Sequence, residues 1–434
     1  MSELRKAIQV NQRVPLLQGI PLSIQHLFAM FSASVLVPTL FGINPAVVLF
    51  MNGIGTLLYI FLTKGKAPAF LGSSFAFLSP TFIILANPHL GYRYALGGFI
   101  VSGFLFCVAA AVVKLFGTRW IDVLLPAAAM GPVVALIGLE LAGTAANMGG
   151  LILNETYTEL DPNQVTAFII TLATAVFGSV LFRKFFSAIP VLISIIVGYL
   201  VSLPLGLVDF SPVSQARWFS LPNFTTPQWN LSAVMIILPA TLVVISEHIG
   251  HQIVTGKIVG RDLIKDPGLH RTLLGDGLST MISGCLGSVP TTTYGENMGV
   301  MAVTKVYSVW VIGGAGVLSI LLGFIGKVSA LITTIPVPVM GGVSFLLYGM
   351  IAASGLRLLV EGRVNYDHSR NLALTSVVFV TGLSGAFIKI GEVELKGMAL
   401  ATIVAMALSL VFFAIDKLKL ANDGGSTRYP EINL

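Results

Sequence analysis

Long apolar stretches run through the whole of this 434-residue chain and constrain its fold more than any other feature. A bilayer core of about 30 Å needs roughly 20 apolar residues in helical conformation, and a window of that length finds fourteen such stretches. Charged residues make up only 10% of the sequence, against about 25% in soluble domains. A soluble fold cannot keep so much apolar surface from water, so the sequence predicts an all-α polytopic membrane protein.

The predicted segments form two sets of seven. The first set spans residues 18–42, 45–63, 69–86, 94–117, 120–142, 165–182 and 188–206. The second set spans residues 232–254, 270–287, 293–304, 307–326, 330–355, 371–388 and 398–415. The third and the tenth segments are poor as continuous helices, so the count needs an independent test.

The basic residues provide that test. With a cytoplasmic N-terminus, alternation through fourteen crossings puts 20 of the 25 Lys and Arg residues on the cytoplasmic side. This asymmetry is what the positive-inside rule describes, and removing either weak segment would invert every later loop. We therefore expect fourteen crossings of the cell (inner or plasma) membrane, with both termini cytoplasmic. The net charge of +6 is dispersed between segments, which excludes a nucleic-acid-binding patch.

Similar motifs recur in the same order in the two halves of the chain. Pro126 and Pro336 each precede a Met-Gly pair by four residues, and Asn-Gly-Ile-Gly-Thr at 52–56 resembles Asp-Gly-Leu-Ser-Thr at 276–280. Seven segments in each half is an odd number, so the halves must be inserted in opposite orientations. We expect two inverted repeats, residues 1–210 and 211–434, which is the build of many secondary transporters. A channel remains an alternative.

The two weak segments occupy corresponding positions in these repeats. Each follows a proline, Pro68 or Pro290, with residues that favour strands or turns before a helix-like stretch, and counting six residues from each proline aligns Ser74 with Glu296. Irregular backbone at membrane depth persists only where protein or a cavity satisfies its polar groups. Paired breaks of this kind indicate a transporter's binding site, where half-helix N-termini direct N–H groups at a substrate. Ordinary kinks beside glycine and proline are the alternative.

Acidic residues inside apolar segments mark the same region. Glu247 lies within the eighth segment and Glu296 within the tenth, although a charge at the bilayer centre costs roughly 2.5–3.5 kcal/mol. His251 follows Glu247 by four residues and shares its helix face, whereas His248 points elsewhere. An acid and a histidine in such a place can load and release a proton. An ion pair that only joins helices is the alternative for each of them.

Polar and aromatic residues elsewhere would complete such a site. Gln25 and His26 in the first segment would support it through hydrogen bonds or, alternatively, join helices. Phe75 and Tyr294 offer aromatic faces. No lysine or arginine is expected at the centre, which disfavours an anionic substrate. The donors and acceptors instead favour a neutral, flat molecule with alternating C=O and N–H groups.

These motifs carry a resemblance that covers essentially the whole chain. Residues 296–305 read Glu-Asn-Met-Gly-Val-Met-Ala-Val-Thr-Lys, residues 72–75 Gly-Ser-Ser-Phe and residues 246–251 Ser-Glu-His-Ile-Gly-His, in addition to the Gln25-His26 pair. Together they resemble the uracil permease branch of the nucleobase–ascorbate (nucleobase–cation symporter) transporter family. The resemblance implies a secondary active transporter that imports uracil by proton symport, with no cofactor and no metal.

The same resemblance implies an architecture and a set of site residues. Segments 1–4 and 8–11 would form a core domain, segments 5–7 and 12–14 a gate domain, and short antiparallel strands in segments three and ten would meet at the substrate. Homodimers would form through gate-domain contacts. The substrate-binding residues would be Glu247, Glu296, Phe75, Gly295, Ser74, Tyr294 and Tyr348, with the two acids at the ring nitrogens and the Phe75 and Gly295 amides at the oxygens. Proton coupling would involve His251, Glu247 and Glu296, supported by Gln25, His26 and Asn297.

Alternatives to uracil import remain at this stage. Another nucleobase such as xanthine is the nearest, although relatives that carry purines commonly have glutamine where this chain has Glu296. An anion exchanger or channel of the same fold would be expected to lack that acid and to conduct without protons. A membrane enzyme would need a nucleophile–base pair or metal ligands, and the Glu247 and His251 pair has no third partner in the sequence.

Overall fold

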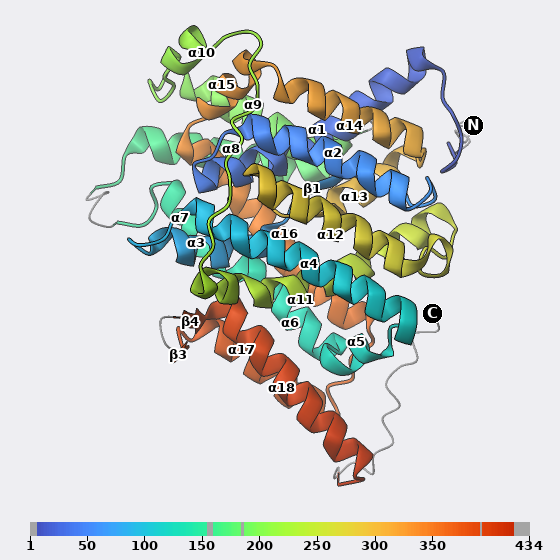
Figure 1. Cartoon of the computed structure of the whole chain (residues 1–434). Helices are drawn as coiled ribbons and strands as arrows, with labels where there is room; N and C mark the ends of the chain where they lie inside the picture. Colours follow the sequence, from blue (N-terminus) through green and yellow to red (C-terminus); the bar gives the residue numbers. More distant parts are fainter. Residues whose placement is uncertain (1–6, 154–158, 184–185, 391–392, 421–434) are drawn as a thin grey trace.

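The computed structural model describes residues 7–153, 159–183, 186–390 and 393–420, and it is built almost wholly of helices (Figure 1). The helices of the first half are α1 (Leu16–Phe41), α2 (Pro45–Leu62), η1 (Phe75–Phe77), α3 (Leu78–Ala86), α4 (Tyr92–Phe116), α5 (Arg119–Leu124), α6 (Ala127–Glu140), α7 (Ala142–Met148), α8 (Pro162–Leu181), η2 (Phe186–Ala188) and α9 (Pro190–Ser202). Those of the second half are α10 (Ser211–Gln215), α11 (Leu231–Val259), η3 (Ile264–Gly268), α12 (Leu269–Leu286), α13 (Gly295–Thr304), α14 (Val309–Gly323), α15 (Gly326–Thr333), α16 (Val337–Glu361), α17 (Ser369–Leu383) and α18 (Gly397–Lys417). The strands are β1 (Leu71–Ser73), β2 (Thr291–Thr293), β3 (Phe387–Ile390) and β4 (Val393–Lys396).

Helix length and hydropathy identify a multi-pass membrane protein. Within the described ranges, seven stretches are long and apolar enough to span a bilayer: α2, α4, Ala127–Met148, α8, α11, α16 and α18. In Figure 1 the start of α1 lies at the upper right, the β3–β4 hairpin at the left and the end of α18 at the bottom. The count of fourteen stays a prediction.

Two predicted segments are divided at the prolines that marked the repeat. Pro126 is the N-cap of α6, so the predicted segment 120–142 is split between α5 and α6. Pro336 is the N-cap of α16, so the predicted start at residue 330 is wrong and residues 326–333 form the separate helix α15. Proline ends a preceding helix because it lacks an N–H and restricts the residue before it. Both breaks therefore follow from the same residue at matching positions.

The hairpin formed by β3 and β4 was not predicted. The segment expected to be helical over 371–388 ends as α17 at Leu383, and Gly385 then adopts a positive φ of 74°. Phe387 pairs with Lys396 across the antiparallel hairpin. A left-handed residue after a helix is a common termination signal, so Gly385 was the clue in the sequence.

Strands β1 and β2 join the two halves of the chain. They pair antiparallel with Leu71 opposite Thr293. Strand β1 lies within the third predicted segment, whereas β2 comes before the tenth predicted segment, 293–304, and shares only Thr293 with it. Thr56 Oγ1 in α2 accepts the Leu71 N–H at 2.9 Å, and Thr280 Oγ1 in α12 accepts the Thr291 N–H at 3.2 Å. Each threonine is the last residue of the repeated five-residue motif and binds the first residue of its own strand.

This geometry corrects one alignment. The helices after the strands begin at Phe75 and Gly295, so Ser74 corresponds to Tyr294. The alignment of Ser74 with Glu296, obtained by counting from the prolines, is wrong by two residues, because the connections from each proline to its strand differ in length.

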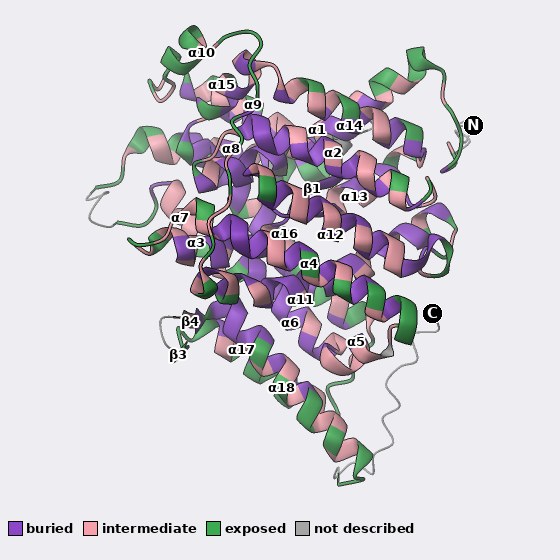
Figure 2. Cartoon of the chain, in the orientation of Figure 1, coloured by how far each residue is buried: buried purple, intermediate pink, exposed green. Residues whose placement is uncertain are grey.

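Helices from the two halves of the chain pack against each other, with α2 against α14 and α12 against α4. Glycines allow both contacts: a Cβ at Gly53 would lie 2.3 Å from the Gly316 carbonyl oxygen, and one at Gly103 would lie 2.5 Å from that of Gly277. Exposed positions gather on the outward faces of α4, α17 and α18 (Figure 2). Many of them are large and apolar, such as Phe104 and Val380, as expected of surfaces that face lipid.

Candidate functional site

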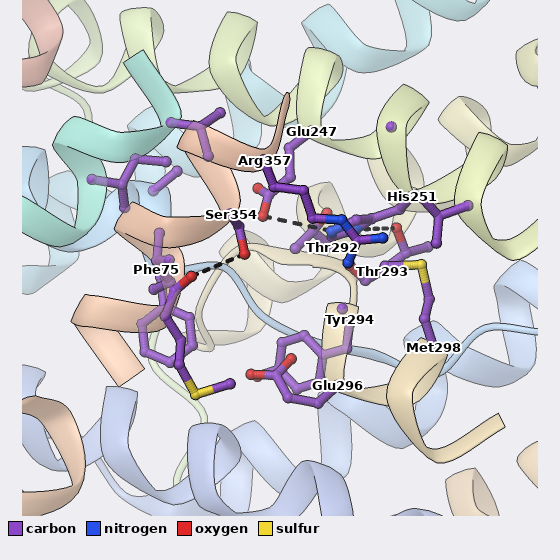
Figure 3. Close-up of a pocket in the computed structure, with 18 of the residues that line it drawn as sticks. Phe75, Glu247, His251, Thr292, Thr293, Tyr294, Glu296, Met298, Ser354 and Arg357 are labelled. Atoms are coloured by element: carbon purple, nitrogen blue, oxygen red, sulfur yellow. Dashed lines mark hydrogen bonds and ion pairs between the residues drawn. The ribbon is translucent and has the colours of Figure 1, made fainter. Parts of the chain in front are cut away.

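A cavity of about 350 Å³ lies where the two interrupted segments meet (Figure 3). One wall is formed by α11 and by the β2–α13 junction, and the other by α16. Of the predicted site residues, those that line it are Phe75, Glu247, His251, Tyr294, Gly295 and Glu296. Residues far apart in the sequence thus converge on one space.

Both predicted acids face this cavity from different elements. Glu247 projects from the middle of α11, and Glu296 is the second residue of α13 (Figure 3). The Glu247 side chain is 26% exposed, so it meets the cavity and not only the surrounding helices. Two carboxylates on one cavity can accept two hydrogen bonds from a bound molecule.

The orientation of His251 follows from its hydrogen bond to the backbone. Its Nδ1 lies 2.7 Å from the carbonyl oxygen of Thr293. A carbonyl can only accept, so Nδ1 carries the proton and Nε2 of the neutral ring is the acceptor. Nε2 lies 3.9 Å from Glu247 Oε1, which is longer than a direct hydrogen bond. A proton could therefore pass between them through a small rotation or one intervening water.

Two helix starts face the cavity with the same backbone geometry. Ser74 precedes η1 with φ −78° and ψ 124°, and Tyr294 precedes α13 with φ −86° and ψ 132°. Neither residue caps its helix with a side-chain hydrogen bond. The first N–H groups, at Phe75 and Gly295, therefore lie at the cavity wall with the positive ends of two helix dipoles. Such donors suit carbonyl oxygens.

The remaining predicted residues lie around the cavity. His26 Nδ1 is 3.0 Å from Asn297 Oδ1, which joins α1 to α13, and Gln25 is buried beside them. Ser74 is buried and donates its N–H to Pro290 at 2.9 Å, so it does not line the cavity. Tyr348 lies behind the wall, with its ring 6.4 Å from that of Phe75 in an edge-to-face arrangement.

Sequence reasoning missed the α16 wall and the support behind β2. Arg357 and Glu361 line the cavity and form an ion pair at 2.8 Å, although Arg357 was assigned to a loop. Their i, i+4 spacing was the available signal. Behind the site, Asp276 Oδ2 lies 2.8 Å from His248 Nδ1 and 3.2 Å from the Thr292 hydroxyl, with both ionisable side chains fully buried. His248 thus faces away from the cavity and fixes β2.

Sequence comparisons identify relatives of this chain. A model described as the Permease family matches residues 17–391. The chain is 58% identical over 421 residues to a protein named uracil permease in Paenibacillus larvae, covering 96% of this chain and 99% of that protein. It is 59% identical over 415 residues to the uracil permease of Escherichia coli K12, covering 96% of each. The uracil permease of Bacillus subtilis is 47% identical over 399 residues, covering 90% of this chain and 91% of that one.

Solved structures share the fold at low identity. The transmembrane domain of the cyanobacterial bicarbonate transporter BicA has a TM-score of 0.62 at 14% identity, covering 93% of this chain and all of that domain. Murine Slc26a9, an anion transporter in the inward-facing state, has a TM-score of 0.69 at 10% identity, covering 95% of this chain and 69% of that one. These matches concern the fold alone.

Proposed function

The chain belongs to the permease family, and from that premise we propose that it is a uracil permease, a secondary transporter that imports uracil together with protons. Relatives named uracil permease are 47–59% identical to it over nine-tenths or more of both chains. The members of this set are transporters and not enzymes. The cytoplasmic membrane is the proposed location, with both termini on the cytoplasmic side.

The assignment of uracil as the substrate rests on one observation: two carboxylates and two helix N-termini face the same cavity. Uracil is a flat ring with two N–H groups and two carbonyl oxygens. We assign the N–H groups to Glu247 and Glu296, and the oxygens to the backbone amides of Phe75 and Gly295. Tyr294 contributes an aromatic surface, while Ser74 and Tyr348 hold the Phe75 region in place.

Proton coupling is assigned to Glu247, Glu296 and His251. Their side chains share the cavity, and the neutral His251 ring offers an acceptor nitrogen toward Glu247. A protonated acid keeps a carbonyl oxygen that can accept a substrate N–H, so a proton and uracil can occupy the site together, as symport requires. Gln25, His26 and Asn297 support the α13 end of the site through the α1–α13 hydrogen bond.

The transport motion is assigned to two domains, a core of segments 1–4 and 8–11 and a gate of segments 5–7 and 12–14. The packing of α2 on α14 and α12 on α4 supports the first unit, and that of α16 on α6 and α8 the second. The cavity lies between the core residues of α11 and α13 and the gate helix α16. Because Arg357 and Arg363 follow the positive-inside bias, we infer that the cavity opens to the cytoplasm. A homodimer formed through the gate domain is part of the proposal.

Competition for uptake tests the substrate. Purified protein in proteoliposomes should take up labelled uracil, and excess unlabelled uracil should abolish that uptake while xanthine and adenine leave it within about twofold. Equal inhibition by xanthine would make the protein a general nucleobase permease. Uptake that is insensitive to every nucleobase would overturn the proposal.

A further inference from the structure

A second cavity, of about 230 Å³, lies at the end of the molecule where four gate helices converge. It is bordered by the start of α6, the end of α16, the connection to α17 and one face of α18. None of its lining residues lines the cavity assigned to uracil. Arg363 and Lys417 place it at the side of the membrane that the charge bias assigns to the cytoplasm.

The start of α6 supplies backbone donors to this cavity. Ala127 and Ala128 are the first residues of the helix and line the space. The N-cap is Pro126, whose side chain has no acceptor to offer them. The first N–H groups of a helix lack intrahelical partners and carry the positive end of its dipole, so they favour an anion.

An arginine side chain lines the same cavity as these donors. Arg363 lines the cavity and is exposed, and among the described residues its guanidinium has no carboxylate partner. Arg370 also lines the cavity, but its guanidinium is bound to the Asp416 carboxylate, so the two charges offset each other. The uncompensated charge of the cavity is therefore positive and comes from Arg363.

A buried hydroxyl gives an independent indication of a ligand. Ser409 lies on α18 with 2% of its surface exposed, lines the cavity, and has no hydrogen-bond partner within the described residues. Thr402 on the same helix donates to the carbonyl four residues earlier, Met398, at 2.8 Å, as such hydroxyls usually do. Ser409 does not, and leaving a buried hydroxyl unpaired costs about 1–3 kcal/mol. A ligand oxygen in the cavity would offset that cost.

We propose that this cavity binds a phosphate group, held by the Arg363 guanidinium, the N–H groups of Ala127 and Ala128 and the Ser409 hydroxyl. Basic pockets between helices at the cytoplasmic surface bind the headgroups of anionic lipids, and free phosphate carries the same chemistry. A bound headgroup would join α6, α16, α17 and α18. It would stabilise the gate domain without contact to the substrate.

The test measures binding and thermal unfolding of the purified full-length protein in detergent. The probes are phosphatidylglycerol, phosphatidylcholine and inorganic phosphate, and the proteins are the parent, Arg363→Gln, Ser409→Ala and Lys114→Gln. Lys114 lies in the last turn of α4 and does not line the cavity, so its variant controls for the loss of one charge. Uracil binding by each protein reports that it is folded.

For the parent we expect phosphatidylglycerol to raise the unfolding temperature and to bind at least about tenfold more tightly than phosphatidylcholine. Arg363→Gln should weaken that binding roughly tenfold, the loss of one charge-assisted hydrogen bond, and Ser409→Ala severalfold, while Lys114→Gln leaves it unchanged. Inorganic phosphate that binds with the same dependence on Arg363, when the lipid does not, would support the site with free phosphate as its ligand. Equal lipid binding by the parent and Arg363→Gln, or an equal loss in Lys114→Gln, would overturn the proposal.

Discussion

At the scale of single residues, Glu247 and Glu296 differ from Glu361, the third acid on the cavity, in forming no ion pair with an arginine or lysine of the described residues. Glu361 is held by Arg357, whereas Glu247 has only the Nε2 of His251 at 3.9 Å. A carboxylate that lacks a fixed cation at membrane depth is costly. This arrangement is understandable if the acid binds a proton together with the substrate N–H, because protonation removes the buried charge while an acceptor oxygen remains.

Replacing Glu247 therefore tests binding directly. Glu247→Ala removes the acceptor for a ring N–H, and leaving that buried polar group unpaired costs about 1–3 kcal/mol. We expect uracil affinity to fall at least about tenfold, measured by equilibrium binding to purified protein. Glu361→Ala, which removes an acid of the same cavity wall, is the control and should bind within about twofold of the parent. Normal affinity of Glu247→Ala would make this carboxylate structural.

His251 should separate binding from coupling. Its ring is held by Thr293 and presents Nε2 to Glu247, so His251→Ala should retain measurable uracil binding while losing most gradient-driven uptake. Its binding should also change in pH dependence, because the two groups titrate as a coupled pair. Binding from pH 5 to 9 and vesicle uptake would be measured together. A parental pH profile with normal uptake would leave His251 as a packing residue.

The sequence predicted the acids and His251 because membrane-embedded ionisable residues are rare and costly. It did not predict that Arg357 reaches the cavity, since a long side chain at a helix end is equally compatible with a solvated loop. The sequence also predicted that Ser74 and Tyr348 contact the substrate, whereas both lie behind the cavity wall. A small rotation of a helix decides which of its residues faces a cavity, and spacing along the sequence does not determine that rotation. Residue spacing shows which side chains share one face of a helix, but it does not show which other element packs against that face.

At the scale of elements, the site depends on how each repeat anchors its strand. A three-residue strand has few backbone hydrogen bonds of its own, and the threonines of α2 and α12 each satisfy one buried N–H. The repeated motif indicated this correspondence in the sequence. The role of the threonine in anchoring the strand was not predictable from the sequence. Each hydrogen bond joins a helix to a strand, and their relative positions depend on how the whole core packs.

Removing either anchor should loosen the site. Thr56→Val or Thr280→Val leaves a buried strand N–H unpaired, at a cost of about 1–3 kcal/mol, and we expect a lower unfolding temperature together with weaker uracil binding. Thr402→Val is the matched control, because that buried hydroxyl bonds only its own helix. Thermal unfolding in detergent and equilibrium binding provide the two readouts. If all three variants behave alike, the anchors have no special role.

At the scale of the whole molecule, two hydrogen bonds of Glu140 join the proposed core and gate at the end opposite to the proposed cytoplasmic opening. Ser79 of α3 donates to Glu140 Oε1 of α6 at 2.7 Å, and Glu140 Oε2 accepts the Met398 N–H of α18 at 3.0 Å. Glu140 thus joins α6 to α18, which the proposal places in the gate, and to α3, which it places in the core. Alternating access requires this contact to break.

Fixing that contact should stop transport but not binding. In a background with Cys107 and Cys285 replaced by serine, Ser79→Cys with Glu140→Cys joined by a short thiol cross-linker should abolish uptake and leave uracil affinity within about twofold. Phe168→Cys with Phe345→Cys joins α8 and α16, two helices of the proposed gate whose rings are in contact, and the same treatment should leave uptake intact. Undiminished uptake by the first cross-linked pair would contradict relative motion of α3 and α6.

The most direct test of proton-driven uracil import uses proteoliposomes with an imposed gradient. With acid outside and no sodium, labelled uracil should accumulate above its external concentration, and a protonophore should collapse the accumulation to equilibration. A sodium gradient at equal pH should give no accumulation. Accumulation that needs sodium and persists with the protonophore would contradict the proposed coupling through Glu247, Glu296 and His251.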